Sequence, residues 1–346
     1  MNINRITKVI MVFFVLIFLV GTFTACSAKK EDGNLTVRIA YFPNITHSQA
    51  LIGKAEGQFQ KALGDNIKIE WKQFNAGSSE IEALLAGEID IGYIGPGPAI
   101  NGYVKSKGEL QIISGATNAG AILVSRKDTA IKDIKDLSGK RIAVPQFGNT
   151  QDLILRYLLQ QYGLKCTTKG GTVEIRQAAN SDIKILLDKG DIDAALVPEP
   201  WGSRLVKEVN ANIVLDYDQV WRDGKYAAAV VIVRTKFLKE YPDIVEKFLR
   251  THVELTEYVN ENVDKAKETV NAQINELTKK SLSKDVLDES FKRLVITTNP
   301  EIDSIKEFIT LSMNIRNLKQ APDAENLLNL EILNRVLKEK GVQEVK

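Results

Sequence analysis

Four short polar loops in this sequence have the residue types of an anion-binding site. Each follows a predicted strand, precedes a predicted helix, and carries small, hydroxyl or amide residues where that helix would begin. Backbone N–H groups in the first turn of a helix lack intrahelical acceptors, and the helix dipole adds positive potential there. The loops are PNITHS at 43–48, NAGSS at 75–79, GPGP at 95–98 and QFGNTQD at 146–152. None contains Lys or Arg, so neutral donors would hold a bound anion.

The candidate ligand-binding residues come from these loops and from two further segments, TNAG at 117–120 and PEPW at 198–201. They are Asn44, Thr46, His47, Ser78, Ser79, Gly95, Pro96, Gly97, Asn118, Asn149, Thr150, Gln151, Glu199 and Trp201. Several have a structural alternative, because hydroxyl and amide side chains also cap helices and a Trp can pack beneath a site. If the ligand is neutral or cationic, Glu199 becomes the pivotal residue. The same carboxylate would also suit a hinge contact or a solvated position.

The composition leaves little material for catalysis or for a metal centre. The chain has two His and two Cys residues, too few for a zinc cluster or a Cys/His catalytic pair, so we expect no metal, cofactor or catalytic residue. Residues 1–25 contain two basic and no acidic residues, so the rest of the chain has 44 of each sign. A nucleic-acid partner would require a basic excess, and none is present.

The first 25 residues have the pattern of an export signal. Arg5 and Lys8 precede an apolar stretch over 9–20, which is short for a membrane span, and small or polar residues follow. The segment TFTACS resembles a bacterial lipoprotein box, in which the cysteine becomes the lipidated first residue of the mature protein. Phe23 stands where that box usually has Leu. We therefore expect cleavage after residue 25 and a lipid on Cys26.

Residues 26–34, CSAKKEDGN, are polar and suit a tether between that lipid and a folded domain. This N-terminal pattern predicts an extracytoplasmic protein that is lipid-anchored to the cell membrane. An uncleaved N-terminal anchor is the alternative, and it would leave the rest of the chain in the same location.

A helix, a turn and a strand occur in the same order twice. The segments are SSEIEALLAGEIDIGYIGPGP at 78–98 and NSDIKILLDKGDIDAALVPEP at 180–200, and each ends where Gly or Pro breaks the strand. Ser79 with Glu82 fits a capping box for the first helix. Elsewhere we expect one helix over 46–64, a turn at GATNAG between two strands, and only helices after residue 237. Strands alternating with helices predict an α/β fold.

These segments together resemble a bacterial ABC-transporter solute-binding lipoprotein of the nitrate, sulfonate and taurine family. The resemblance covers roughly residues 35–260 with gaps, and its most specific pieces are LLAGEIDIGYIG and VPEPW. It implies the two-lobed type II periplasmic-binding-protein fold, with mixed sheets flanked by helices, two crossing hinge segments and a helical C-terminal region. The crossings would be AILVSRKD and YAAAVVIVRT. The first lobe would hold residues 35–122 and 229–346, and the second lobe residues 123–228.

The resemblance implies a monomeric binding protein and not an enzyme. It would close two lobes around a small ligand, most simply an aliphatic sulfonate, taurine or nitrate type oxyanion. It would then deliver that ligand to ABC permease and ATPase subunits. Two alternatives stay open: an extracellular ligand sensor, and a heteroaromatic ligand of the thiamine-pyrimidine or riboflavin type. The second would need stacking surfaces, and the aromatic residues near the expected mouth are Tyr41, Phe42, Tyr93, Phe147 and Trp201.

Overall fold

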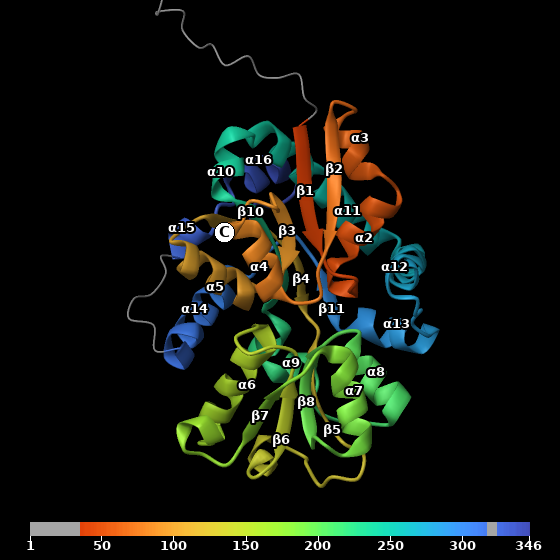
Figure 1. Ribbon diagram of the computed structural model, residues 1–346. Helices are drawn as coiled ribbons and strands as arrows, with labels where there is room; N and C mark the ends of the chain where they lie inside the picture. The colour runs from red at the N-terminus through yellow and green to blue at the C-terminus, as the bar shows by residue number, and fades with distance from the viewer. Residues whose placement is uncertain (1–34, 317–323) are drawn as a thin grey trace, which may run out of the picture. The chain divides into compact units, whose positions relative to one another are not determined.

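Two mixed β-sheets flanked by helices make up the described part of the chain (Figure 1). The structure is a computed structural model, and it describes residues 35–316 and 324–346. The predicted signal peptide, the lipidation site at Cys26 and the tether lie outside these residues. The predicted α/β class with mixed sheets is confirmed. None of the described helices is both long and apolar enough to cross a membrane.

The first sheet has six strands in the order β11-β4-β10-β3-β1-β2. Strands β1 and β3 are parallel, whereas β10 runs antiparallel to both β3 and β4. The central strand β10 has the apolar sequence AAAVVIVR because it has neighbours on both edges and is buried on both faces. The strands are β1 Leu35–Tyr41, β2 Ile67–Gln73, β3 Ile91–Ile94, β4 Leu110–Ala119, β10 Ala227–Arg234 and β11 Leu294–Ile296.

Most helices of this part of the fold lie between its strands or follow β10. They are η1 Ile45–His47, α2 Ser48–Ala55, α3 Gln58–Leu63, α4 Gly77–Leu85, α5 Pro96–Ser106, α10 Thr235–Glu240, α11 Pro242–Glu261 and α12 Val263–Thr278. The single helix predicted over 46–64 is wrong, since the chain forms α2 and α3 there. Gly57 lies between them with a φ of 67°, a left-handed conformation that glycine adopts without a steric cost and that interrupts the helix.

The second sheet has five strands in the order β7-β6-β8-β5-β9. Strands β6, β7 and β8 are parallel, and β5 is antiparallel to β8 and β9. Its strands are β5 Ala121–Ser125, β6 Arg141–Val144, β7 Glu174–Gln177, β8 Ala194–Pro198 and β9 Asn212–Leu215. Its helices are η2 Ile134–Leu137, α6 Thr150–Gln161, η3 Thr167–Lys169, α7 Asn180–Lys189, α8 Trp201–Val209, α9 Tyr217–Val220 and η4 Arg222–Gly224.

The chain passes between the sheets twice, as predicted, but each predicted crossing segment is largely a strand of one sheet, β5 or β10, and the chain crosses just before it. The first crossing is at Gly120, where β4 ends and β5 begins, and the second leads into β10. The predicted turn over GATNAG is wrong for most of its length, because residues 115–119 continue β4 as a buried strand. The break is confined to Ala119 and Gly120, whose φ angles are 65° and 80°.

The C-terminal region is helical except for one short strand. The remaining helices are α13 Lys284–Lys292, α14 Ile302–Arg316, α15 Ala324–Leu327 and α16 Glu331–Glu339. The expectation of helices alone is wrong at β11, which pairs antiparallel with the edge of β4. Helix α13 packs on α8, and α14 packs on both α5 and α6. The C-terminal helices therefore contact elements of both sheets.

Candidate functional site

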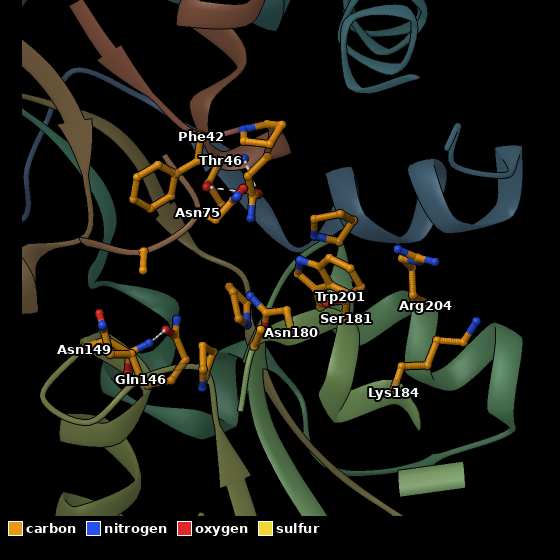
Figure 2. Close-up of a pocket in the computed structure, with 18 of the residues that line it drawn as sticks. Phe42, Thr46, Asn75, Gln146, Asn149, Asn180, Ser181, Lys184, Trp201 and Arg204 are labelled. Carbon is orange, nitrogen blue, oxygen red and sulfur yellow. Dashed lines mark hydrogen bonds between the residues drawn. The ribbon is translucent and has the colours of Figure 1, made fainter. Parts of the chain in front are cut away.

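A cavity of about 900 Å³ lies where the carboxyl ends of strands from both sheets meet (Figure 2). Its wall comes from the segments that follow β1, β2 and β3 of the first sheet and β6, β7 and β8 of the second. In Figure 2, Phe42, Thr46 and Asn75 face Gln146 and Asn149 across the open space. Ligands of α/β proteins commonly bind at such strand ends.

Besides α2, which continues directly from η1, five α-helices begin at the wall of this cavity. The wall residues at these helix starts are Ala76 and Gly77 of α4, Gly95 of α5, Asn149 and Thr150 of α6, Ala179 and Asn180 of α7, and Pro200 and Trp201 of α8. The Asn149 side chain caps α6 by accepting from Asp152 N at 2.9 Å. The other four helices have no side-chain cap at their N-cap residue. Their dipoles favour negative charge in the cavity. Helix α5 contributes its dipole alone, because Pro96 and Pro98 have no N–H and Gly97 N donates to Thr150.

Eight of the predicted site residues line the cavity: Asn44, Thr46, His47, Gly95, Asn149, Thr150, Gln151 and Trp201. The Asn44 side chain accepts from Thr46 N at 3.0 Å and Thr46 Oγ1 at 3.1 Å, which fixes the loop after β1. The Thr150 hydroxyl also accepts from Gly97 N of α5 at 3.5 Å, so it touches both walls. Asn101 Nδ2 donates to Gly148 O at 2.8 Å and closes the α5–α6 side of the cavity.

His47 is a neutral part of this wall. Its Nδ1 accepts a hydrogen bond from Phe42 N at 3.1 Å, and the ring stacks on Phe42 with centroids 4.8 Å apart. Burial lowers the pKa of His47 to about 3, since the charged imidazolium would lose its hydration. Because Nδ1 is an acceptor, the single ring proton is on Nε2. His47 therefore supplies a neutral N–H group and no charge.

Six of the predicted site residues lie outside the set that lines the cavity: Ser78, Ser79, Pro96, Gly97, Asn118 and Glu199. Ser78 Oγ accepts from Gln146 Nε2 at 2.6 Å, which links the α4 loop to the second sheet. Asn118 Nδ2 donates to Asn299 O at 3.1 Å. The predicted capping box of Ser79 is wrong, because α4 already begins at Gly77 and Ser79 Oγ donates to Ala76 O instead.

Glu199 is fully buried behind the wall. Its carboxylate accepts from Ser203 N and Ser203 Oγ at 2.9 Å, from Ser290 Oγ at 3.0 Å and from Arg293 at 3.4 Å. Burial raises the pKa of Glu199, and the bonds from Ser203 together with the charge of Arg293 oppose that rise. These partners join the start of α8 to α13. The carboxylate is thus engaged by protein groups, and the structure presents none of it to the cavity.

Sequence reasoning missed two groups of wall residues. The first group is polar: Asn75 and Gln146 belong to predicted loops but are absent from the candidate list, and Gln177, Asn180 and Ser181 come from a segment that was not selected. The segment 177–181 follows β7 and opens α7, so the rule that selected the other loops would have found it. The second group is basic and consists of Lys184, Lys189, Arg204 and Lys280. These residues come from the bodies of α7 and α8 and from the segment after α12, and no local sequence signal places them at the site.

Two of the basic residues, Lys184 and Arg204, lie on the side of the cavity away from Gln146 and Asn149 (Figure 2), and their charges are partly neutralised. Lys184 and Arg204 both pair with Glu208, the second through Nε at 2.8 Å. The guanidinium of Arg204 also lies 4.5 Å from the ring centroid of Trp201, a cation–π contact. Asp188 is the one acidic residue among the described wall residues. The described residues contain no cluster of three side chains that would suit a metal ion.

The strand ends and helix N-termini of two mixed β-sheets enclose one cavity. This arrangement defines the class of the protein, which has the periplasmic-binding-protein fold. The chain belongs to the NMT1-like family, whose model matches residues 30–275. The Bacillus subtilis (strain 168) protein named "Putative aliphatic sulfonates-binding protein" is 26% identical, and the alignment covers 96% of this chain and 97% of that protein.

A second relative is similar to this chain in sequence, and a solved structure is similar to it in fold. The taurine-binding periplasmic protein of Escherichia coli (strain K12) is 29% identical over 64% of this chain and 65% of its own length. The crystal structure of the periplasmic aliphatic sulphonate binding protein from Escherichia coli superposes with a TM-score of 0.70 at 18% identity, covering 85% of this chain and 97% of that one. At that identity the superposition supports the fold alone.

Proposed function

We propose that this protein is the solute-binding component of an ABC importer for an organic oxyanion of the sulfonate or taurine type. The observation that carries the proposal is the convergence of five helix N-termini on one cavity. A fully ionised sulfonate has three acceptor oxygens and no proton to donate. It therefore matches backbone N–H groups and neutral side-chain donors such as His47 Nε2 and Asn149 Nδ2 better than a neutral solute does.

The charges at the cavity support the same choice of ligand. Four basic residues and one acidic residue line it among the described residues, and both histidines of the chain are buried with lowered pKa values. The excess of positive charge would draw an anion into the cleft. Glu199 is sequestered by Ser203, Ser290 and Arg293, so its carboxylate does not face the ligand.

Closure of two lobes would hold the ligand, because wall residues come from both sheets and only a closed form brings both sets of donors to one anion. We infer binding and delivery without catalysis, since the relatives named above are binding proteins. The partners would be a membrane permease and its ATPase subunits. The N-terminal pattern supports export and a lipid on Cys26 as the anchor, with the binding protein itself monomeric.

Calorimetry with matched charged and neutral ligands tests the proposal. The purified protein would be unfolded and refolded to remove bound solute, and then titrated with ethanesulfonate, taurine, nitrate and ethanesulfonamide. Ethanesulfonamide has nearly the shape of ethanesulfonate but no charge. We expect ethanesulfonate to bind about 100-fold more tightly, which corresponds to about 2.7 kcal/mol from charge-assisted hydrogen bonds and helix dipoles. Equal affinity for the two compounds would refute the oxyanion assignment.

A further inference from the structure

The loop that leads into α6 borders two cavities. Gln146 and Asn149 line the cavity of about 900 Å³ described above, the ligand cavity, and they are seen there in Figure 2. Residues 147–148, together with Asp152 and Arg156 of α6, line a second cavity of about 300 Å³. Neighbouring residues of the loop therefore face different cavities, and side chains at the smaller cavity can act on the ligand cavity through the loop.

Asp152 holds this loop from the side of the smaller cavity. Its Oδ2 accepts from Gly148 N at 2.7 Å, and its own backbone N–H donates to Asn149 Oδ1 at 2.9 Å. The side chain is only 2% exposed. It therefore places a buried negative charge in the first turn of α6, where the helix dipole favours it. The same charge would repel an anion that binds at the start of this helix.

Arg156 supplies the opposite charge one helical turn further along α6. Its Nε donates to Asp152 Oδ1 at 2.8 Å, and its Nη1 donates to Cys166 Sγ at 3.3 Å. The guanidinium carbon also lies 6.0 Å from the ring centroid of Phe147 in the loop. The Arg156 side chain is 18% exposed, so the ion pair is largely shielded from bulk water and salt screens it weakly. The two charges cancel at the ligand cavity only while Arg156 is present.

We propose that Arg156 sets the affinity of the site for anions without touching the ligand, by cancelling the charge of the carboxylate that positions the α6 loop. Asp152 is the positioning residue of that loop, and Arg156 acts through Asp152. This inference rests on the proposed function, because it takes the ligand to be an anion that binds at the start of α6. Asp152 is three residue steps beyond the N-cap Asn149, so its carboxylate would lie roughly 10 Å from such an anion. At that distance and an effective dielectric constant of about 20, an uncompensated unit charge changes a dissociation constant roughly 10- to 20-fold.

Two variants with opposite changes of charge test this inference by calorimetry on the whole protein. The ligands are ethanesulfonate and its neutral analogue ethanesulfonamide. Arg156→Met leaves the Asp152 carboxylate uncompensated and should weaken ethanesulfonate binding about tenfold. Asp152→Asn keeps an acceptor for Gly148 N but leaves the charge of Arg156 in excess, and it should strengthen ethanesulfonate binding at least about threefold. Ethanesulfonamide binding should stay within about twofold of wild type in both variants, since an uncharged ligand does not respond to the added charge.

Two further variants are the controls. Arg156→Lys keeps a positive charge beside Asp152 and should bind ethanesulfonate within about threefold of wild type. Arg250→Met breaks another pair of the same i,i+4 spacing, with Glu246 on α11 at 3.3 Å. Arg250 lies outside the set of residues that line the ligand cavity, so this variant should change neither affinity. If Arg156→Met does not fold, the measurement on Asp152→Asn decides the question alone.

The sign of the two shifts separates the effect of charge from that of structure. Opposite shifts in ethanesulfonate affinity, with ethanesulfonamide unchanged, would support the inference. Weaker binding of both ligands in both variants would overturn it, because the pair would then act only by holding the loop in shape. Unchanged ethanesulfonate affinity in both variants would overturn it as well. These two results would leave the proposed function standing, whereas a wild-type protein without preference for ethanesulfonate over ethanesulfonamide would overturn both.

Discussion

Replacing Glu199 by Gln should lower the stability of the protein and leave its choice of ligand unchanged. The Glu199 carboxylate accepts four hydrogen bonds, from two groups of Ser203, from Ser290 and from Arg293. A glutamine keeps one oxygen and turns an NH₂ group toward donors, so at least one of them loses its acceptor. Breaking a buried ion pair costs about 3–5 kcal/mol. Arg293 keeps Asp216 at 2.7 Å, so we expect a loss near the lower end, about 3 kcal/mol.

Urea denaturation at pH 7 would measure this loss, with Ser290→Ala as the control. That control removes one hydroxyl donor and leaves both charges in place, so it should cost only about 1–2 kcal/mol. A change below about 0.5 kcal/mol in Glu199→Gln would refute the stabilising role of the cluster, because surface substitutions alone have effects of that size.

The ligand measurement separates this structural role from recognition of a ligand amine. Taurine and ethanesulfonate differ at the end opposite the sulfonate, where taurine carries an ammonium group. The ratio of their dissociation constants should be the same in wild type and in Glu199→Gln, because the carboxylate lies behind the cavity wall. A change in that ratio of more than about threefold, or about 0.6 kcal/mol, would place Glu199 at the ligand and refute the structural argument.

Four further predictions concern stability, ligand binding and location. Glu80 is fully buried, neither of its carboxylate oxygens has a partner among the described residues, and burial raises its pKa. Glu80→Met should therefore stabilise the fold by about 2 kcal/mol at pH 7, and by less below pH 4.5, where Glu80 is also protonated in the unfolded chain. Equal denaturation midpoints of variant and wild type at pH 7 would contradict this. Burial lowers the pKa of His47 to about 3 and that of His252 to about 4, so only the unfolded chain gains protons as pH falls below 6.5. Stability should then drop by on the order of 2 kcal/mol per histidine by pH 5, and a smaller acid slope in His47→Gln would support it. Thr150→Ala should weaken ethanesulfonate binding by about 1 kcal/mol, roughly fivefold, through loss of a hydroxyl at both walls; unchanged affinity in calorimetry would limit Thr150 to packing. Cys26→Ser should move the protein from the membrane fraction to the medium or periplasm, and retention at the membrane would favour an uncleaved anchor.

Local sequence patterns were enough to predict the α/β class and eight of the residues that line the cavity. Alternating strands and amphipathic helices predicted the α/β architecture, and the short polar loops after strands predicted where helices would begin. The rule worked because a strand end followed by a helix start puts backbone N–H groups at one sheet edge, whatever packs elsewhere. It would equally have found Asn180 and Ser181 if it had been applied to the strand at 174–177.

Tertiary structure alone decided which side chains line the cavity and which are buried behind its wall. Glu199 is removed from the cavity by Ser290 and Arg293, more than 90 residues away in the chain. Lys280 and Leu282, from the segment after α12, line the same cavity as residues of α7 that precede them by about 90 positions in the chain. Burial, ion pairing and the direction of a side chain depend on partners distant in sequence. The residues next to Glu199 therefore do not predict which partners its carboxylate has.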